Sequence, residues 1–255
     1  MDERRRGTWV LDLDGVLWLA GEAIAGSADA VSRLRDSGIT VLFVTNNSLP
    51  TRHELVGQLA AVGIAAEPGD LVTSAQVAAS LLAPGSTAVV CAGAGVDEAL
   101  ADRGVHVVPE GPADAVVVGL TRAFDFAMLA TAMTALRAGA RLVATNDDAT
   151  FPTPGRLQPG TGSLVAAVAT AGGVAAEVAG KPHPPVADLV SARAPDVTMV
   201  VGDRPSTDGL LARRLGVPFA LVRSGVTPPE TPVTEVVPDV DGADLADVVE
   251  QFLAS

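Results

Sequence analysis

The 255-residue chain is poor in several residue types, and each shortage excludes a class of protein. It has a single cysteine, Cys91, so no disulfide can form within the chain, and we expect a reducing compartment. The apolar flanks of Cys91 predict a buried strand thiol and not a nucleophile. No apolar run approaches the ~20 residues that are needed to cross a bilayer. The first residues, MDERRRGTW, lack an apolar signal segment, so we expect a cytoplasmic protein.

Positive charge is scarce as well. There are 17 lysines and arginines against 30 aspartates and glutamates, a net charge of −13, which argues against a nucleic-acid or anionic-membrane surface. All but one of the basic residues are arginine, and the exception is Lys181 in the segment GKPHP. An acidic protein that binds an anionic substrate needs local positive charge, from a metal or from a few placed cations. We therefore favour Lys181 as a site residue over a leftover surface residue.

The segment Trp9–Leu17, WVLDLDGVL, runs from apolar residues into Asp12-Leu13-Asp14-Gly15. An apolar run with an abrupt polar end is typical of a buried parallel strand, and open α/β sheets bind ligands at this carboxyl edge. Two carboxylates beside Gly15, which lets backbone come close, suit a hard cation and a phosphate. The alternative is an ordinary turn after a strand, since Asp and Gly are common turn residues.

Two further apolar runs end in the same way. Ile39–Val44 leads into Thr45-Asn46-Asn47, and Val197–Val201 leads into Gly202-Asp203, with Asp208 five residues later. Parallel strands would bring these ends to one edge of a sheet. Carboxylates for Mg²⁺, hydroxyl and amide donors for phosphate oxygens, and the ammonium of Lys181 are the parts that phosphoryl transfer requires.

The middle of the chain repeats the alternation of strands and helices. We expect strands at 88–91, 105–108, 115–118 and 142–145, which are enough for an inserted α/β domain over 83–178. Residues 1–82 and 179–255 then form the first domain, with a last strand near Val236-Val237. Gly93-Ala94-Gly95 after a strand also suggests a dinucleotide-binding oxidoreductase, but Glu98 stands where the third glycine should be.

The motifs DxDGV, TNN, GKP and GDxxxxD, in this order, resemble those of the haloacid dehalogenase (HAD) superfamily of phosphohydrolases. The long insert is similar to the large cap of subfamily IIA, the NagD-like and p-nitrophenylphosphatase-like branch. The resemblance implies an α/β fold: a Rossmann-like parallel-sheet core with a large inserted α/β cap domain. It also implies a Mg²⁺-dependent phosphatase that acts on a small phosphorylated metabolite.

Carried over by this resemblance, Asp12 is the nucleophile that forms an aspartyl-phosphate, and Asp14 is the general acid and base. Thr45 and Asn46, with Asn47 and Gly15 beside them, hold the phosphoryl group, and Lys181 neutralises its charge. The resemblance places Mg²⁺ between the carboxylates of Asp12 and Asp203 and the backbone carbonyl of Asp14. It implies that Asp208 orients waters or Lys181 from behind these ligands.

The segment Thr145–Pro152 resembles the specificity loop of the family, with Asp147 and Phe151 as candidate substrate contacts. Pyridoxal-phosphate phosphatases have a histidine where Phe151 falls, so glycerol 3-phosphate, phosphoglycolate or a sugar phosphate is favoured. Contacts from Arg204 or His183 stay open. A homodimer through the cap is a further arrangement that the family suggests. The alternatives are a phosphotransferase or phosphomutase on the same scaffold, and a non-catalytic protein that binds a phosphorylated metabolite.

Overall fold

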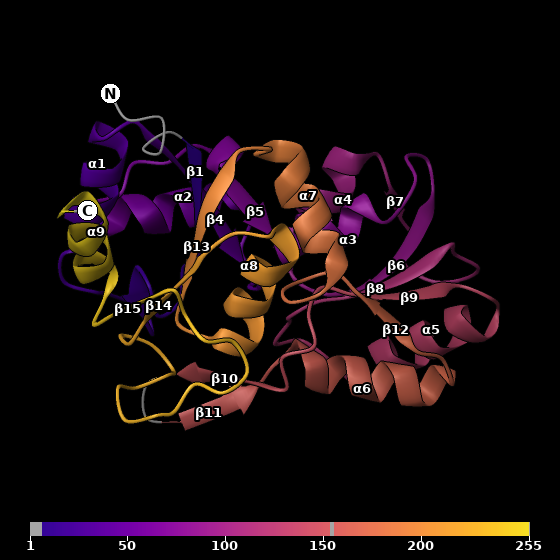
Figure 1. Cartoon of the computed structure of the whole chain (residues 1–255). Helices are drawn as coiled ribbons and strands as arrows, with labels where there is room; N and C mark the ends of the chain where they lie inside the picture. The colour runs from indigo at the N-terminus through magenta and orange to yellow at the C-terminus, as the bar shows by residue number, and fades with distance from the viewer. Residues whose placement is uncertain (1–6, 154–155, 255) are drawn as a thin grey trace. The chain divides into compact units, whose positions relative to one another are not determined.

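A computed structural model describes residues 7–153 and 156–254, which form two compact units (Figure 1). Unit 1 consists of the described residues of Met1–Thr45, Leu55–Val72 and Ala187–Ser255. Unit 2 consists of Asn46–Glu54 and the described residues of Thr73–Val186. Within the described ranges, no helix has both the length and the apolar character that a membrane span requires.

Unit 1 is built on a six-stranded sheet with the order β15-β14-β13-β1-β4-β5. Strand β1 pairs in parallel with β13 on one side and with β4 on the other, and β14 pairs in parallel with β13 and β15. The chain builds the sheet outward in one direction through β4 and in the other through β13. The boundary between β1 and β13 is therefore a topological switch point, where sheets of this kind bind ligands. The strands are β1 (Gly7–Leu11), β4 (Ile39–Thr45), β5 (Leu71–Thr73), β13 (Val197–Gly202), β14 (Phe219–Val222) and β15 (Val240–Gly242).

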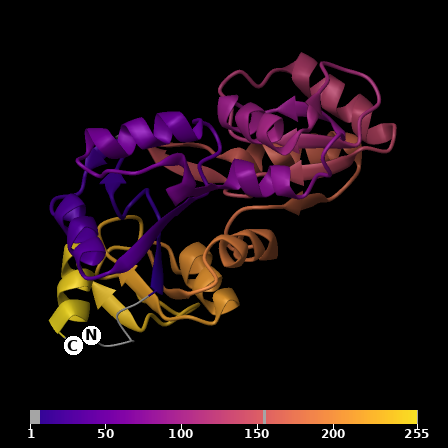
Figure 2. The ribbon, with the colours of Figure 1, turned by 90° about the horizontal axis from the view of Figure 1, so that it is seen from above.

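Helices α1, α2 and α9 bury apolar side chains against one side of this sheet. In α1 the buried residues Ala30, Val31 and Leu34 have the spacing of a single helix face. Helices α1 and α9 lie side by side (Figure 2), and Phe252 of α9 meets Trp9 of β1 edge-on, with ring centroids 4.9 Å apart. The helices that lie wholly or mostly in unit 1 are α1 (Ser27–Asp36), α2 (Arg52–Ala61), α7 (Pro184–Arg193), α8 (Leu210–Leu215) and α9 (Leu245–Ala254). Unit 1 also has a 3₁₀ turn at Pro68–Asp70, a π turn at Pro205–Gly209 and a hairpin of β2 (Trp18–Leu19) and β3 (Glu22–Ala23).

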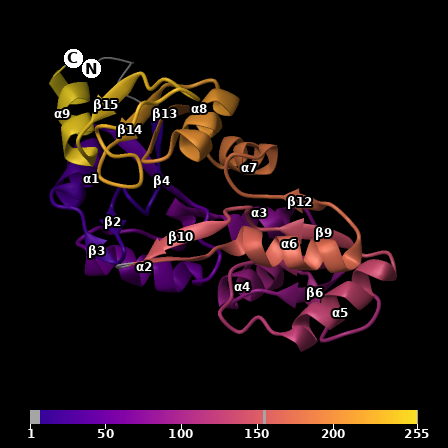
Figure 3. The ribbon, with the colours of Figure 1, turned by 90° about the horizontal axis from the view of Figure 1, so that it is seen from below.

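Unit 2 has its own parallel sheet, with the order β12-β9-β8-β6-β7. Helices α5 and α6 pack against each other and against one face of β6, β8 and β9 (Figure 3). The strands are β6 (Thr87–Cys91), β7 (His106–Val107), β8 (Ala115–Val118), β9 (Arg141–Ala144) and β12 (Ala176–Val178), with an antiparallel hairpin of β10 (Thr150–Thr153) and β11 (Arg156–Pro159). The helices are α3 (Ser74–Ser80), α4 (Ala94–Arg103), α5 (Phe126–Arg137) and α6 (Thr161–Gly172).

Cys91 ends β6 inside this core and is buried, as its apolar flanks predict. Burial raises the pKa of its thiol to about 11, so the thiolate fraction at pH 8 is roughly 10²-fold below that of an ordinary cysteine. We expect the native protein to react with 5,5′-dithiobis(2-nitrobenzoic acid) at least about 10²-fold more slowly than the protein in guanidinium chloride. Equal rates in the two states would contradict the buried position.

The last strand of unit 1 lies further along the chain than Val236-Val237, so that expectation is wrong. Val236 is buried and Val237 is exposed, but the strand is β15, and its pairing with β14 begins at Val240. Pro238 has no N–H to donate to a neighbouring strand. The hydrogen bonds toward Phe219 begin immediately after it, where the N–H of Asp239 donates to the carbonyl of Phe219 at 2.8 Å.

Candidate active site and metal centre

The first part of the candidate site lies at the carboxyl ends of β1 and β13 in unit 1. Asp12 follows β1 and Asp203 follows β13. The N–H of Asp12 donates to the carbonyl of Val201 at 3.0 Å, which continues the parallel pairing by one residue. The register of the two strands therefore brings Asp12 and Asp203 to the same edge of the sheet.

Asp208 reaches this edge from the π turn Pro205–Gly209. Its N–H donates to the carbonyl of Arg204 at 2.9 Å, and its carboxylate accepts from the N–H of Arg204 at 3.2 Å. Gly202 makes room for the turn, because a Cβ at this position would overlap with the carboxyl group of Asp208. Isolated π turns are frequent at functional sites, and here one folds an acidic side chain back toward the strand end.

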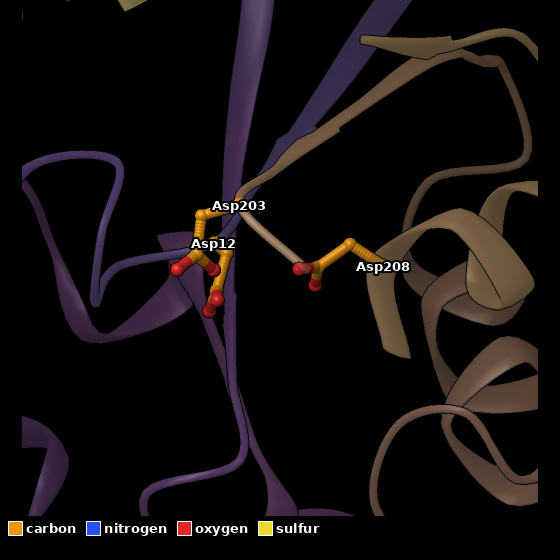
Figure 4. A group of neighbouring side chains, drawn as sticks. All are labelled: Asp12, Asp203 and Asp208. Carbon is orange, nitrogen blue, oxygen red and sulfur yellow. The ribbon is translucent and has the colours of Figure 1, made fainter. Parts of the chain in front are cut away.

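Asp12, Asp203 and Asp208 each offer a carboxylate oxygen, and these three atoms lie within 4.8 Å of one another (Figure 4). Asp203 and Asp208 are buried, and Asp12 is half-buried. At an effective dielectric constant near 20, two unit charges at this separation repel by roughly 3–4 kcal/mol. A divalent cation offsets such repulsion, and carboxylate oxygens are the donors that Mg²⁺ prefers. These donors fit Mg²⁺. Among the described residues, this is the one cluster of three or more His, Cys, Asp or Glu side chains with ligand atoms close enough to share a metal ion.

Gly15 lies against this group. Its φ of +82° falls in the left-handed region, and a Cβ built on it would overlap with the carboxyl group of Asp203. Only glycine combines this backbone conformation with the absence of a side chain. Gly15 is expected to allow a close backbone approach, and here its own backbone lies close to the carboxyl group of Asp203.

Asp14 is exposed, whereas Asp12 is half-buried. The indole N–H of the buried Trp18 donates to Oδ1 of Asp14 at 3.1 Å, and the N–H of Gly15 donates to the carbonyl of Trp18 at 2.7 Å. These bonds close a tight turn after β1. The two aspartates of the DxD segment thus differ in exposure, which is compatible with different chemical roles.

Thr45, the last residue of β4, is buried in unit 1. The pairing of Leu11 with Phe43 sets the register of β1 and β4, so Asp12 and Thr45 extend toward the same edge of the sheet. The six expected site residues in unit 1 are Asp12, Asp14, Gly15, Thr45, Asp203 and Asp208.

The remaining expected site residues belong to unit 2, where Asn46 holds the segment around Lys181. The Asn46 side chain accepts from the N–H of Lys181 at 2.8 Å and donates to the carbonyl of Lys181 at 3.0 Å and to Asp148 at 3.0 Å. Its own carbonyl accepts from Ser74 and from the amide of Asn146, each at 2.7 Å. Lys181 is buried, so it is not a leftover surface lysine.

Asp147 and Phe151 follow β9 and lie in different settings. Asp147 is exposed, and its carboxylate is 2.8 Å from Nε2 of His183. Phe151 is half-buried in β10. Asn47 uses its side-chain oxygen to accept from the N–H of Leu49 at 3.1 Å, so this side chain shapes the turn after β4.

The glycines of Gly93-Ala94-Gly95 have a packing role in unit 2. A Cβ on Gly95 would overlap with the carbonyl oxygen of Pro50, and the N–H of Gly95 donates to the carbonyl of Leu49 at 3.1 Å. The start of α4 therefore packs directly against the backbone of Leu49 and Pro50. This packing explains the glycines without a bound dinucleotide.

Two family models match the chain at both ends of the sequence. The model described as haloacid dehalogenase-like hydrolase matches residues 9–106, and the model described as HAD-hydrolase-like matches residues 178–248. The acid sugar phosphatase of Staphylococcus saprophyticus is 32% identical over 252 residues, which are 96% of this chain and 97% of that protein. The chain belongs to the haloacid dehalogenase-like hydrolases.

Other relatives agree with this membership in the HAD family. The D-glycerol 3-phosphate phosphatase of Mycobacterium tuberculosis is 39% identical over 85% of this chain and 63% of its own length. A structure of the glycerol phosphate phosphatase from that organism in complex with magnesium has a TM-score of 0.86 at 35% identity, over 97% of this chain and 78% of that one. The p-nitrophenyl phosphatase of Archaeoglobus fulgidus has a TM-score of 0.88 at 27% identity, over 96% of this chain and 98% of that one.

These findings confirm the expected family, its subfamily IIA and the fold class, a Rossmann-like HAD core with an inserted α/β cap. They also confirm that the protein is a HAD-type phosphatase. The domain boundaries after residues 82 and 178 and the roles of the individual site residues stay predictions.

Several residues at the site carry no clear signal in the sequence. The indole N–H of Trp18 donates to Asp14, and this bond depends on the turn between the two residues, which no sequence pattern indicates. Asn146 and Asp148 lie in the segment that resembles the specificity loop, and both bond to Asn46. Val226 donates to Asp203 with its backbone N–H, which any residue except proline could do.

Proposed function

We propose that this phosphatase hydrolyses monoesters of small phosphorylated metabolites with Mg²⁺ bound by Asp12, Asp203 and the backbone carbonyl of Asp14. The observation that carries the proposal is the convergence of the Asp12, Asp203 and Asp208 carboxylates within 4.8 Å at the carboxyl edge of a parallel sheet. A HAD relative that was solved with magnesium supports the choice of cation.

Asp12 is proposed as the nucleophile. One of its carboxylate oxygens attacks phosphorus, the bond from phosphorus to the ester oxygen breaks, and Asp14 gives its proton to the leaving alkoxide. Asp14 then accepts a proton from water as the water oxygen attacks the phosphoryl group. The bond between Asp12 and phosphorus breaks, and inorganic phosphate leaves. The exposed position of Asp14 and its bond to Trp18 suit a group that exchanges a proton with substrate and water.

The other residues position the phosphoryl group. When bound, Mg²⁺ supplies positive charge that reduces repulsion between the dianionic substrate and the Asp12 carboxylate. Thr45 and the backbone of Asn46 donate hydrogen bonds to phosphoryl oxygens, and the ammonium of Lys181 neutralises part of their charge. The bonds from Asn46 to the backbone of Lys181 support this role, because they fix the lysine where its segment begins.

The substrate is proposed to be a small aliphatic or sugar phosphate. Relatives named acid sugar phosphatase and D-glycerol 3-phosphate phosphatase support this class. Residues 83–178 are proposed as the cap that selects the substrate, with Asp147 and Phe151 as contacts, and residues 1–82 and 179–255 as the catalytic core. A homodimer through the cap stays a prediction. A screen of phosphorylated metabolites, ranked by kcat/KM, would test the substrate class, and a preference for pyridoxal phosphate would contradict it.

Removal of the metal tests the function itself. We expect hydrolysis of p-nitrophenyl phosphate to fall by roughly 10²-fold or more in EDTA and to return when Mg²⁺ is added in excess. Without the cation, the carboxylates of Asp12, Asp203 and Asp208 repel the dianionic substrate. The measurement is release of p-nitrophenol at constant ionic strength, with circular dichroism as a check that the fold persists in EDTA. Hydrolysis that continues in EDTA would overturn the metal-dependent mechanism.

A further inference from the structure

The segment Ser224–Val226, which follows β14 in unit 1, lies directly on the carboxylate of Asp203. The N–H of Val226 donates to Oδ2 of Asp203 at 2.7 Å. Gly225 is packed so closely that a Cβ on it would overlap with the same carboxyl group. A hydrogen bond to one oxygen, together with contact from the adjacent residue, restricts the rotation of the carboxylate.

The same segment also forms a hydrogen bond to the turn after β1. The hydroxyl of Ser224 donates to the carbonyl of Gly15 at 2.7 Å. Gly15 itself is in contact range of the Asp203 carboxyl group and directly follows Asp14 in the turn after β1. Ser224–Val226 therefore connects the end of β13 with the turn after β1, which are the two segments that supply the metal ligands proposed above.

Arg223 fixes this segment in place. Its guanidinium donates to both carboxylate oxygens of Asp241, at 2.8 and 2.6 Å, and to the carbonyls of Pro228 and Thr231 at 3.1 Å each. The side chain of Arg223 is only 13% exposed, and the planar fork suits bidentate binding of a carboxylate. The hydrogen bond from Arg223 holds the pKa of Asp241 below its ordinary value, so the pair is charged at neutral pH.

We propose that Ser224–Val226 is a positioning loop that sets the orientation of Asp203 and the turn after β1 for metal binding, and that Arg223 anchors this loop. The inference rests on the proposed function, since it needs Mg²⁺ at Asp203. Ser224 and Arg223 are positioning residues that act through Gly15 and Asp203. Their loss changes the affinity for Mg²⁺ and leaves the chemical step intact once the metal is bound.

Ser224→Ala is the sharpest test, because it removes one hydroxyl and adds no atom. Ser37→Ala is its matched control, since the hydroxyl of Ser37 also donates to a backbone carbonyl in unit 1, that of Leu34 at 2.6 Å. We expect the dissociation constant for Mg²⁺, measured by isothermal titration calorimetry without substrate, to rise roughly five- to tenfold in Ser224→Ala and to stay unchanged in Ser37→Ala. At saturating Mg²⁺, kcat for p-nitrophenyl phosphate is expected to stay within about twofold of the unsubstituted protein.

Arg223→Gln is a second variant, with Arg35→Gln as its control, because Arg35 donates to the carbonyl of Ala65 at 2.7 Å and pairs with Asp70 at 4.0 Å. We expect Arg223→Gln to weaken Mg²⁺ binding by a similar factor and Arg35→Gln to leave it unchanged. An unchanged affinity in both Ser224→Ala and Arg223→Gln, with melting temperatures that show folded protein, would overturn the inference. An equal change in the control variants would also overturn it. If the unsubstituted protein fails to bind Mg²⁺, the proposed function itself is wrong.

Discussion

Asp12→Asn is expected to lower kcat for p-nitrophenyl phosphate by roughly 10³-fold or more, the range found when an essential nucleophile is removed. Asparagine has nearly the shape of aspartate, but its neutral amide is a far weaker nucleophile toward phosphorus. The change also removes one of three converging negative charges, which lowers the demand for a cation. The rate of p-nitrophenol release at saturating Mg²⁺ is the measurement.

Two further measurements separate the loss of a nucleophile from the loss of the fold. Asp36→Asn makes the same chemical change at an exposed position of unit 1 and should keep full activity. Acid-quenched protein should carry a phosphoryl group on the peptide that contains Asp12, detected by mass spectrometry, and Asp12→Asn should not. Turnover that survives in Asp12→Asn would rule out a covalent intermediate on this residue.

The main strand ends of unit 1 could be predicted because two simple patterns coincide there. The apolar runs before Asp12, Thr45 and Asp203 stop abruptly, and the rules for parallel sheets bring such ends to one edge. The first pattern is local, since it needs only a short apolar run and the identity of the next residue. The family resemblance added the roles, which no periodicity can supply.

The position of Asp208 could not be predicted in the same way. It lies five residues beyond Asp203, and the turn that folds it back depends on the space above Gly202. The resemblance implied that Asp208 would stand behind the metal ligands. Its carboxylate offers an oxygen within 4.8 Å of oxygens of Asp12 and Asp203, which is compatible with a metal ligand and with a residue behind the ligands. Its proposed part in holding water or metal is therefore open to direct test by Mg²⁺ titration of Asp208→Asn.

The hairpin of β10 and β11 shows a second limit. Pro152 and Pro159 lie within these strands, and proline argues against a strand because it cannot donate to a ladder. A ribbon of two strands tolerates proline, since each strand has an edge without a partner in the ribbon. Whether a proline faces such an edge depends on the pairing register, which is not visible in a single sequence.

Gly15→Ala is expected to disrupt the metal centre, because it adds a methyl group in the turn after β1 at the position that faces Asp203. The added Cβ would occupy the space of the Asp203 carboxyl group, so either Asp203 or the turn must move. We expect Mg²⁺ affinity to fall by at least roughly tenfold, the effect that a displaced ligand partner produces, and kcat to fall with it. Calorimetry with Mg²⁺ and p-nitrophenol release are the measurements.

Gly21→Ala is the control that makes this result specific. Gly21 has φ +87°, nearly the same as the +82° of Gly15, so alanine at either position carries the same left-handed strain of about 1–2 kcal/mol. A Cβ on Gly21 meets no atom within 4 Å, whereas a Cβ on Gly15 meets Asp203. Both variants should therefore lose similar thermal stability from strain, but only Gly15→Ala should lose Mg²⁺. Equal Mg²⁺ affinity in the two variants would mean that Asp203 does not need the space beside Gly15 to bind the metal.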